Sequence, residues 1–194
     1  MLTRLGAWCG VAAGLCIALP AAVEAVTGET ALTSFVLALS PALAVPLLVV
    51  LHLRQNPDTF GTVAFTVNAV GLGLFGGAAF TLNTTLFYLD DAVVADLLRG
   101  PTSLALLGSA LIFAVGAVLF GTAMLRAKVH PRVPATAYLV AFPVLAVAAK
   151  LPDTPLTSAV HIVAGASLVW LAAALMPTRS PAPARPAATP PRRA

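Results

Sequence analysis

The chain has 194 residues, of which 59% are hydrophobic and 9% are charged, and its mean hydropathy is +0.96. A soluble domain carries about 25% charged residues, so this composition cannot cover a folded surface in water, and lipid must be the solvent. A membrane-crossing helix needs about 20 apolar residues, so the length holds about five to seven such helices and leaves no room for a soluble domain. Arg is more frequent than Lys, and both Ala and Val are abundant, which suits a bacterial source with GC-rich coding.

The hydropathy pattern predicts an all-α, polytopic integral membrane protein. Residues 1–176 are expected to form a six-helix transmembrane bundle, and the Pro- and Arg-rich residues 177–194 a disordered cytoplasmic tail. Short connections should keep sequence neighbours antiparallel. The six apolar segments are expected at about residues 5–26, 31–53, 60–89, 102–125, 133–150 and 156–176.

The first apolar segment carries small residues at four-residue spacing: Gly6, Gly10 and Gly14. Such spacing lets a second helix approach closely in a membrane, so this face is expected to contact another helix of the bundle or a second copy of the chain. A cleaved signal peptide is the alternative, because Arg4 precedes the apolar run and Pro20 lies near its end. Against it, the run exceeds the roughly 7–15 residues of a signal core.

The segment 60–89 is the longest and the most polar. As a helix its 30 or so residues would reach about 45 Å, against about 30 Å of hydrocarbon, so it is expected to tilt, protrude or bend at its glycines. Gly73 and Gly77 repeat the small-residue spacing and offer a second surface for a homo-oligomer or a membrane protein partner. Residues 91–99 place apolar side chains on one helical face, which predicts a short helix at the membrane interface.

Prolines lie inside two segments: Pro41 and Pro46 in the second, and Pro143 in the fifth. Proline removes a backbone donor and usually kinks a helix. The residues around Pro46 and Pro143 are faintly alike, which would suit the inverted repeat of a transporter. A sequence this rich in Ala, Leu and Val also produces such likeness by chance.

Basic residues are unevenly distributed over the connections. If the segments alternate in direction, nine of the 11 Lys and Arg residues fall on one side, and Arg99 and Lys150 fall on the other. The positive-inside rule assigns the richer side to the cytoplasm, so both termini are expected to be cytoplasmic and the protein to lie in the plasma membrane. Most acidic residues fall on the opposite side, with Asp58 the exception. The nine residues are Arg4, Arg54, Arg126, Lys128, Arg132, Arg179, Arg185, Arg192 and Arg193.

Several polar residues are expected to converge in the outer half of the membrane. Asn83 should lie about 9–10 Å below Asp90 along a continuous helix, and His161 at a similar depth in the last segment. Ionisable groups inside a membrane usually face partners or a water-filled cavity. The candidate catalytic residues are therefore Glu24, Asn83, Asp90, Asp91 and His161. A simpler interpretation places the acids at the headgroup boundary and gives His161 a hydrogen bond within the bundle.

The sequence lacks the common metal, phosphate-loop and nucleophile-elbow motifs. His52 and His161 should lie at opposite depths, which argues against one haem held by both. We therefore expect no metal, cofactor or nucleic-acid partner, and a non-enzymatic accessory or helix-packing protein whose surroundings are membrane lipid. The alternatives are an enzyme acting on a lipid or isoprenoid substrate through the acid and histidine groups, and a small dimeric transporter.

Overall fold

The computed structural model describes residues 1–148 and 154–176, and the regular structure in these ranges is entirely helical. Among the described residues, five helices are long and apolar enough to cross a membrane, namely α1, α2, α3, α5 and α7, whereas α6 is a shorter apolar helix of 17 residues. The elements are α1 (Leu2–Thr27), α2 (Ala31–Arg54), α3 (Thr59–Thr84), the 3-10 turn η1 (Leu86–Tyr88), α4 (Asp91–Leu97), α5 (Pro101–Ala127), α6 (Arg132–Ala148) and α7 (Pro155–Ala173).

The helix ends follow local sequence signals. Thr30 and Thr154 form capping boxes at the starts of α2 and α7, and the Asp58 carboxylate accepts the Gly61 N–H at the start of α3. These side chains satisfy backbone donors that the first helical turn leaves free. Lys128 follows α5 in a left-handed conformation (φ 56°) and turns the chain toward α6. The starts of α2, α3 and α7 are thus fixed by capping residues next to each helix.

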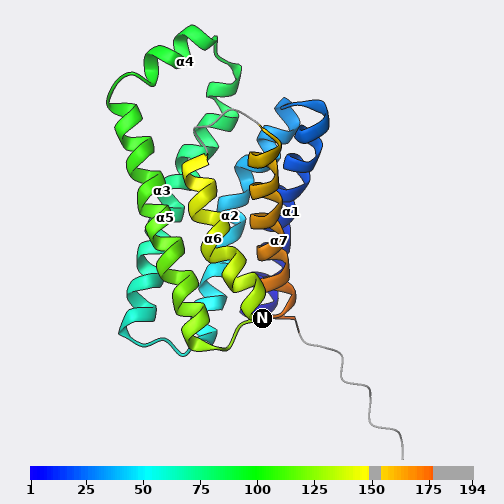
Figure 1. The fold of residues 1–194 in the computed structure, drawn as a ribbon, viewed down its shortest axis with the longest axis vertical. Helices are drawn as coiled ribbons and strands as arrows, with labels where there is room; N and C mark the ends of the chain where they lie inside the picture. Colours follow the sequence, from blue (N-terminus) through cyan, green and yellow to red (C-terminus); the bar gives the residue numbers. More distant parts are fainter. Residues whose placement is uncertain (149–153, 177–194) are drawn as a thin grey trace, which may run out of the picture.

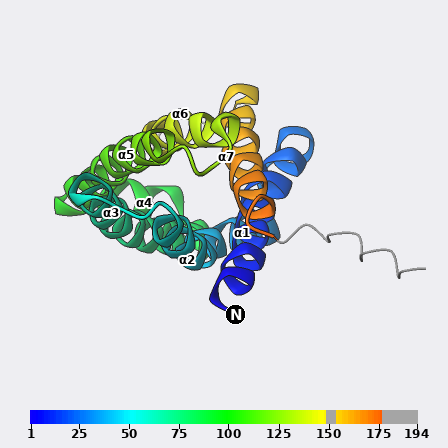
Figure 2. The ribbon, with the colours of Figure 1, turned by 90° about the horizontal axis from the view of Figure 1, so that it is seen from below.

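The five long helices and α6 form a closed ring in the order α1, α2, α3, α5, α6, α7, and α7 packs back against α1 (Figure 2). Each sequential neighbour in the ring is antiparallel to the one before it, as short connections require. The interior is filled by large side chains, and the largest fully buried ones include Phe113, Phe120, Leu47, Leu51 and Met124. By contrast, apolar side chains such as Leu104 and Trp170 are mostly exposed on the outside, which a lipid environment accommodates.

The α1 glycines lie inside the bundle. A Cβ atom added to Gly6 would lie 2.6 Å from Val50, and one added to Gly10 would lie 2.6 Å from Leu47. Gly14 meets Gly165 of α7 so closely that a side chain on either would collide with the backbone of the other helix. This stripe therefore closes the ring between α2 and α7, which is one of the two uses that its spacing predicted.

The two ends of the bundle differ in charge. The amino terminus and the connections 55–58 and 128–131 lie at one end, which we call the basic end; the connection 28–30 and α4 lie at the other, the acidic end (Figure 1). Arg4, Arg54, Arg126, Lys128 and Arg132 lie at or near the basic end. The basic connections of the described residues therefore lie together at one end of the bundle.

Two predicted segments extend past the α-helices that they contain, although the apolar span of α3 and η1 covers Thr59–Tyr88. The third segment, expected over 60–89, ends as an α-helix at Thr84 and continues as η1. The last helix ends at Ala173 instead of residue 176. The predicted interfacial helix over 91–99 is present as α4, which has no buried residue and lies across the top of the α3–α5 pair (Figure 1). Lys150 and the predicted disordered tail over 177–194 lie outside the described residues.

Candidate functional site

The five predicted site residues lie toward the acidic end without direct bonds to one another. Asp90 and Asp91 are exposed at the start of α4. Because α3 ends at Thr84, Asn83 lies in the last turn of that helix and not two turns inside it, as the helical rise had suggested. Within the described residues, no hydrogen bond or ion pair joins any two of Glu24, Asn83, Asp90, Asp91 and His161.

The bonds that two of these residues do make are local. The Asn83 amide donates to the Ala79 carbonyl at 2.8 Å, and His161 Nδ1 donates to the Thr157 carbonyl at 2.8 Å. Both acceptors lie four residues earlier in the same helix, so each bond satisfies the side chain without linking two helices. Glu24 is half-buried, and its Oε1 atom is buried with no hydrogen-bond partner.

A buried polar pair crosses the interior in the half of the bundle nearer the basic end. Asn68 of α3 is 0% exposed, and its Nδ2 atom donates to the Tyr138 hydroxyl of α6 at 2.7 Å. The α5 backbone approaches Asn68 closely, because a Cβ on Gly116 would lie 2.5 Å from the Asn68 Cα. The Asn68 Oδ1 atom has no partner. A polar group placed this way costs free energy unless it is paired, so the pair fixes how α3 and α6 face each other.

Sequence analysis missed this pair. Asn68 stands between apolar residues in the first half of the segment 60–89, whereas the predicted site residue of that segment, Asn83, lies in its second half. A lone amide deep in an apolar helix is destabilised in lipid more than an amide near a helix end. That difference could have identified Asn68 as a residue with a partner inside the bundle. Nothing in the sequence identified Tyr138 as its partner.

Aromatic rings run from the basic end through the interior. His52 stacks on Phe65 with 4.2 Å between ring centroids, and Phe65 is followed by Phe120 at 6.4 Å. Tyr138 contacts Phe120 at 6.2 Å and Phe142 at 4.6 Å. Aromatic contacts at these separations are favourable and rigid. The rings therefore pack the centre of the bundle as a solid core.

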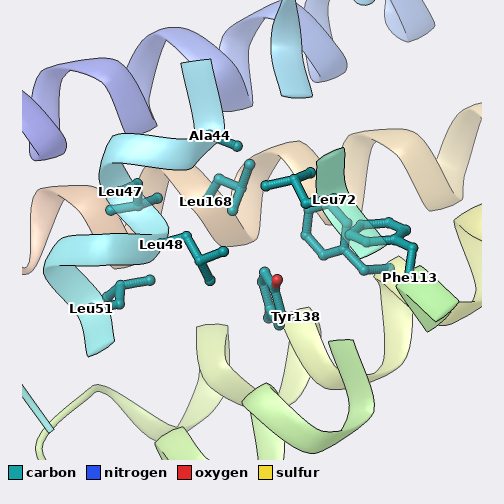
Figure 3. A pocket seen from close by; sticks show the side chains of 9 residues that line it. Ala44, Leu47, Leu48, Leu51, Leu72, Phe113, Tyr138 and Leu168 are labelled. Atoms are coloured by element: carbon teal, nitrogen blue, oxygen red, sulfur yellow. The ribbon is translucent and has the colours of Figure 1, made fainter. Parts of the chain in front are cut away.

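A small cavity lies in that core. It measures about 20 Å³ and is lined mainly by leucine and aromatic side chains, with the Tyr138 hydroxyl lying among them (Figure 3). About 10–15 Å³ of such volume holds one water molecule. This cavity thus has space for a water but not for a lipid, isoprenoid or solute. Neither Pro46 nor Pro143 lines this cavity.

The connection between α5 and α6 is attached to the end of α2 by a histidine. His130 Nε2 lies 3.2 Å from the Leu51 carbonyl, and a carbonyl can only accept, so Nε2 carries the proton. The usual helical donor to that carbonyl, the Gln55 N–H, bonds to His52 O instead. Burial lowers the pKa of His130; the Leu51 hydrogen bond opposes this shift, and the positive charge of Arg54 adds to it. The neutral ring therefore caps α2.

A second hollow opens at the basic end. It measures about 220 Å³ and lies between the α2–α3 connection, the first turn of α3 and the last turns of α5. Gln55 lines it, is 7% exposed, and has a buried Nε2 atom with no hydrogen-bond partner. Arg126 lines the opposite wall, with its guanidinium carbon 4.7 Å from the centre of the Phe60 ring. None of the five predicted site residues lines either hollow.

Residues 1–148 and 154–176 contain no cluster of three or more His, Cys, Asp or Glu side chains that could hold a metal ion. The unpaired buried polar atoms nearest the basic end, on Gln55 and His52, are suited to accept or donate hydrogen bonds. No protein-family model, curated protein or solved structure matches the chain.

Proposed function

We propose that this chain is a multi-pass protein of the plasma membrane that acts without catalysis, by packing against a second copy of itself through the outward face of α3. The observation that carries the proposal is the contrast between two glycine stripes. The α1 stripe is filled by the chain's own helices, whereas Gly73 and Gly77 of α3 are exposed with no atom within 4 Å of an added Cβ. A face of this kind is left open for another helix.

The outward face of α3 has the composition of a membrane helix contact. Gly73, Gly77 and Thr81 are exposed at four-residue spacing, and Val70 and Phe80 are exposed beside them. The Thr81 hydroxyl donates to the Gly77 carbonyl at 3.0 Å, so it needs no water. Small residues let two backbones approach, and the larger neighbours pack around them. Two copies related by a two-fold axis would present this face to each other, which favours a homodimer.

The filled interior supports a non-catalytic role. An enzyme acting on a lipid, or a transporter, needs a chamber of several hundred Å³, and the cavity in the core measures about 20 Å³. Nor do the prolines, on which the transporter alternative rested, line either hollow. Of the acid and histidine candidates, on which the enzyme alternative rested, His161 bonds within its own helix and Asp90 and Asp91 are exposed. Glu24 is half-buried and has one unpaired oxygen, but it lines neither hollow.

The proposed threading has six crossings, with α6 as the sixth, and puts the basic end in the cytoplasm. The grouping of basic residues at one end supports this orientation through the positive-inside rule. Packing of α1 between α2 and α7 favours a retained first helix over a cleaved leader. A reporter fused within residues 128–131 should read out as cytoplasmic, and a periplasmic or extracellular readout would reverse the threading.

Cysteine crosslinking in native membranes tests the dimer. Gly77→Cys is placed in a background with Cys9→Ala and Cys16→Ala, because both native cysteines are half-buried on α1. Mild oxidation should give a covalent dimer. Val140→Cys is the matched control, since Val140 is 54% exposed on α6, away from the proposed contact.

Equal crosslinking at Gly77 and Val140 would indicate random collision and would contradict the proposal. A second variant separates assembly from folding: Gly73→Leu with Gly77→Leu has open space around both side chains in the monomer. It should abolish the dimer and leave the thermal unfolding of the monomer unchanged. A dimer that persists in this variant would also count against the α3 face.

A further inference from the structure

We infer that the hollow at the basic end binds the phosphate group of an anionic membrane lipid. It lies between Gln55, the first turn of α3 and Arg126, and its volume of about 220 Å³ exceeds several times the roughly 30 Å³ that one water occupies in the liquid. That space accommodates a phosphate with part of its hydration. The inference rests on membrane embedding but not on the proposed dimer.

A buried, unpartnered donor lies beside this hollow. Gln55 lines the hollow and is 7% exposed, and its Nε2 atom is shielded from solvent without a hydrogen bond. An unpaired buried donor destabilises the folded chain. A turn of the Gln55 side chain into the hollow would pair this donor with a phosphate oxygen.

Arg126 provides a pre-oriented cation. Its guanidinium lies over the Phe60 ring at 4.7 Å from the centroid. Stacking of this kind uses the face of the guanidinium and leaves its N–H edge free. That edge matches two oxygens of a phosphate, the geometry that makes arginine the usual phosphate ligand.

The surrounding charge favours an anion. Asp58 is the one acid among the residues that line the hollow, and one of its oxygens is engaged by the Gly61 N–H at 2.7 Å. Arg54 and Lys128 flank the same connections as Arg126. The local balance is therefore positive, and it lies at the membrane end of three helices, at the depth where lipid phosphates are found.

Binding is tested on the purified full-length chain in mild detergent. Short-chain phosphatidylglycerol is titrated, and the thermal unfolding midpoint is followed, because a ligand that binds only the folded state raises it. The midpoint should rise with phosphatidylglycerol and stay unchanged with short-chain phosphatidylcholine. Inorganic phosphate is the third titration, and it should give a much smaller rise at equal concentration.

Three variants identify the site. Arg126→Gln should weaken phosphatidylglycerol binding about tenfold, the loss of a charge-assisted contact, and Gln55→Leu should weaken it several-fold while keeping the packing volume. Arg132→Gln is the matched control, since Arg132 is exposed at the same end but does not line the hollow. Equal weakening by Arg126→Gln and Arg132→Gln would overturn the site in favour of diffuse surface charge. An equal response to inorganic phosphate would overturn its assignment to lipid.

Discussion

The basic and acidic ends of the bundle hold their polar side chains in different ways. Toward the basic end, hydrogen bonds join distant parts of the chain: Asn68 to Tyr138, and His130 to the Leu51 carbonyl. Toward the acidic end, Asn83 and His161 bond to their own helices four residues back. Asparagine and histidine side chains therefore form hydrogen bonds between distant parts of the chain at the basic end, and hydrogen bonds within one helix at the acidic end. The difference indicates that the basic half carries the tertiary specificity of the fold.

Substituting one glycine in each half of α5 tests this contrast with the largest expected effect. Gly116→Leu would drive a side chain into the α3 backbone, where the Cβ alone lies 2.5 Å from the Asn68 Cα. The helix backbone cannot shift without losing its own packing, so we expect the folded state to be destabilised by about 3 kcal/mol or more. Gly108→Leu is the control, because no atom lies within 4 Å of a Cβ added there. This variant should unfold at the same temperature as the unsubstituted chain. Similar unfolding midpoints for the two would remove the asymmetry.

The next comparison is between substitutions of the two asparagines of α3, Asn68 and Asn83. Asn68→Ala should lower stability by about 1–2 kcal/mol, because the buried Tyr138 hydroxyl loses its donor. Asn83→Ala removes only a bond to the preceding turn and should have little effect. Unfolding by denaturant in detergent measures both. Tyr138→Phe in the Asn68→Ala background should cost less than it does alone; additive losses would show that the pair is not coupled.

Two histidines give a smaller difference that depends on pH. His130→Ala should lower the free energy of unfolding by about 1 kcal/mol, because the buried Leu51 carbonyl loses its hydrogen-bond donor. His161→Ala should lower it by less. Burial lowers the pKa of His130 from 6.5, so the folded state prefers the neutral ring. Its contribution is complete above pH 6.5 and is lost as pH falls from 6.5 toward the folded pKa, because the unfolded chain then binds the proton first.

His130→Gln keeps a side-chain donor for Leu51 but removes the titration. Unfolding midpoints measured from pH 8 to pH 5 should therefore fall less in this variant than in the natural chain. An identical pH dependence in the two proteins would show that His130 is not the group responsible.

The exposed acids should give the smallest effect. Asp90→Asn with Asp91→Asn changes side chains at the start of α4, a helix without a buried residue. Surface changes away from buried contacts are usually close to neutral, so the unfolding midpoint should not change measurably. A marked loss of stability would mean that the acidic end holds a structural contact comparable to those at the basic end.

The long apolar helices were predictable, and so was one surface helix. The apolar spacing in 91–99 led to a short helix that the structure contains as α4. The end of α3 at Thr84 was not predicted, because the apolar run continues through Leu86 and Phe87 without a helix stop signal. The candidate site was proposed from depth along straight helices. Depth does not tell which way a side chain faces, so it could not show that Asn83 bonds within its own helix.

Composition and spacing by themselves determined that the chain is built of apolar helices suited to lipid, and that basic residues gather at one end. Those properties depend on each segment alone. Only the tertiary structure decided that Gly10 lies against Leu47 and Ala172 while Gly77 is open, and that Asn68 rather than Asn83 gains a partner on another helix. The physical reason is that close approach depends on which helix stands opposite, and this is fixed only when α7 packs back against α1 and closes the ring.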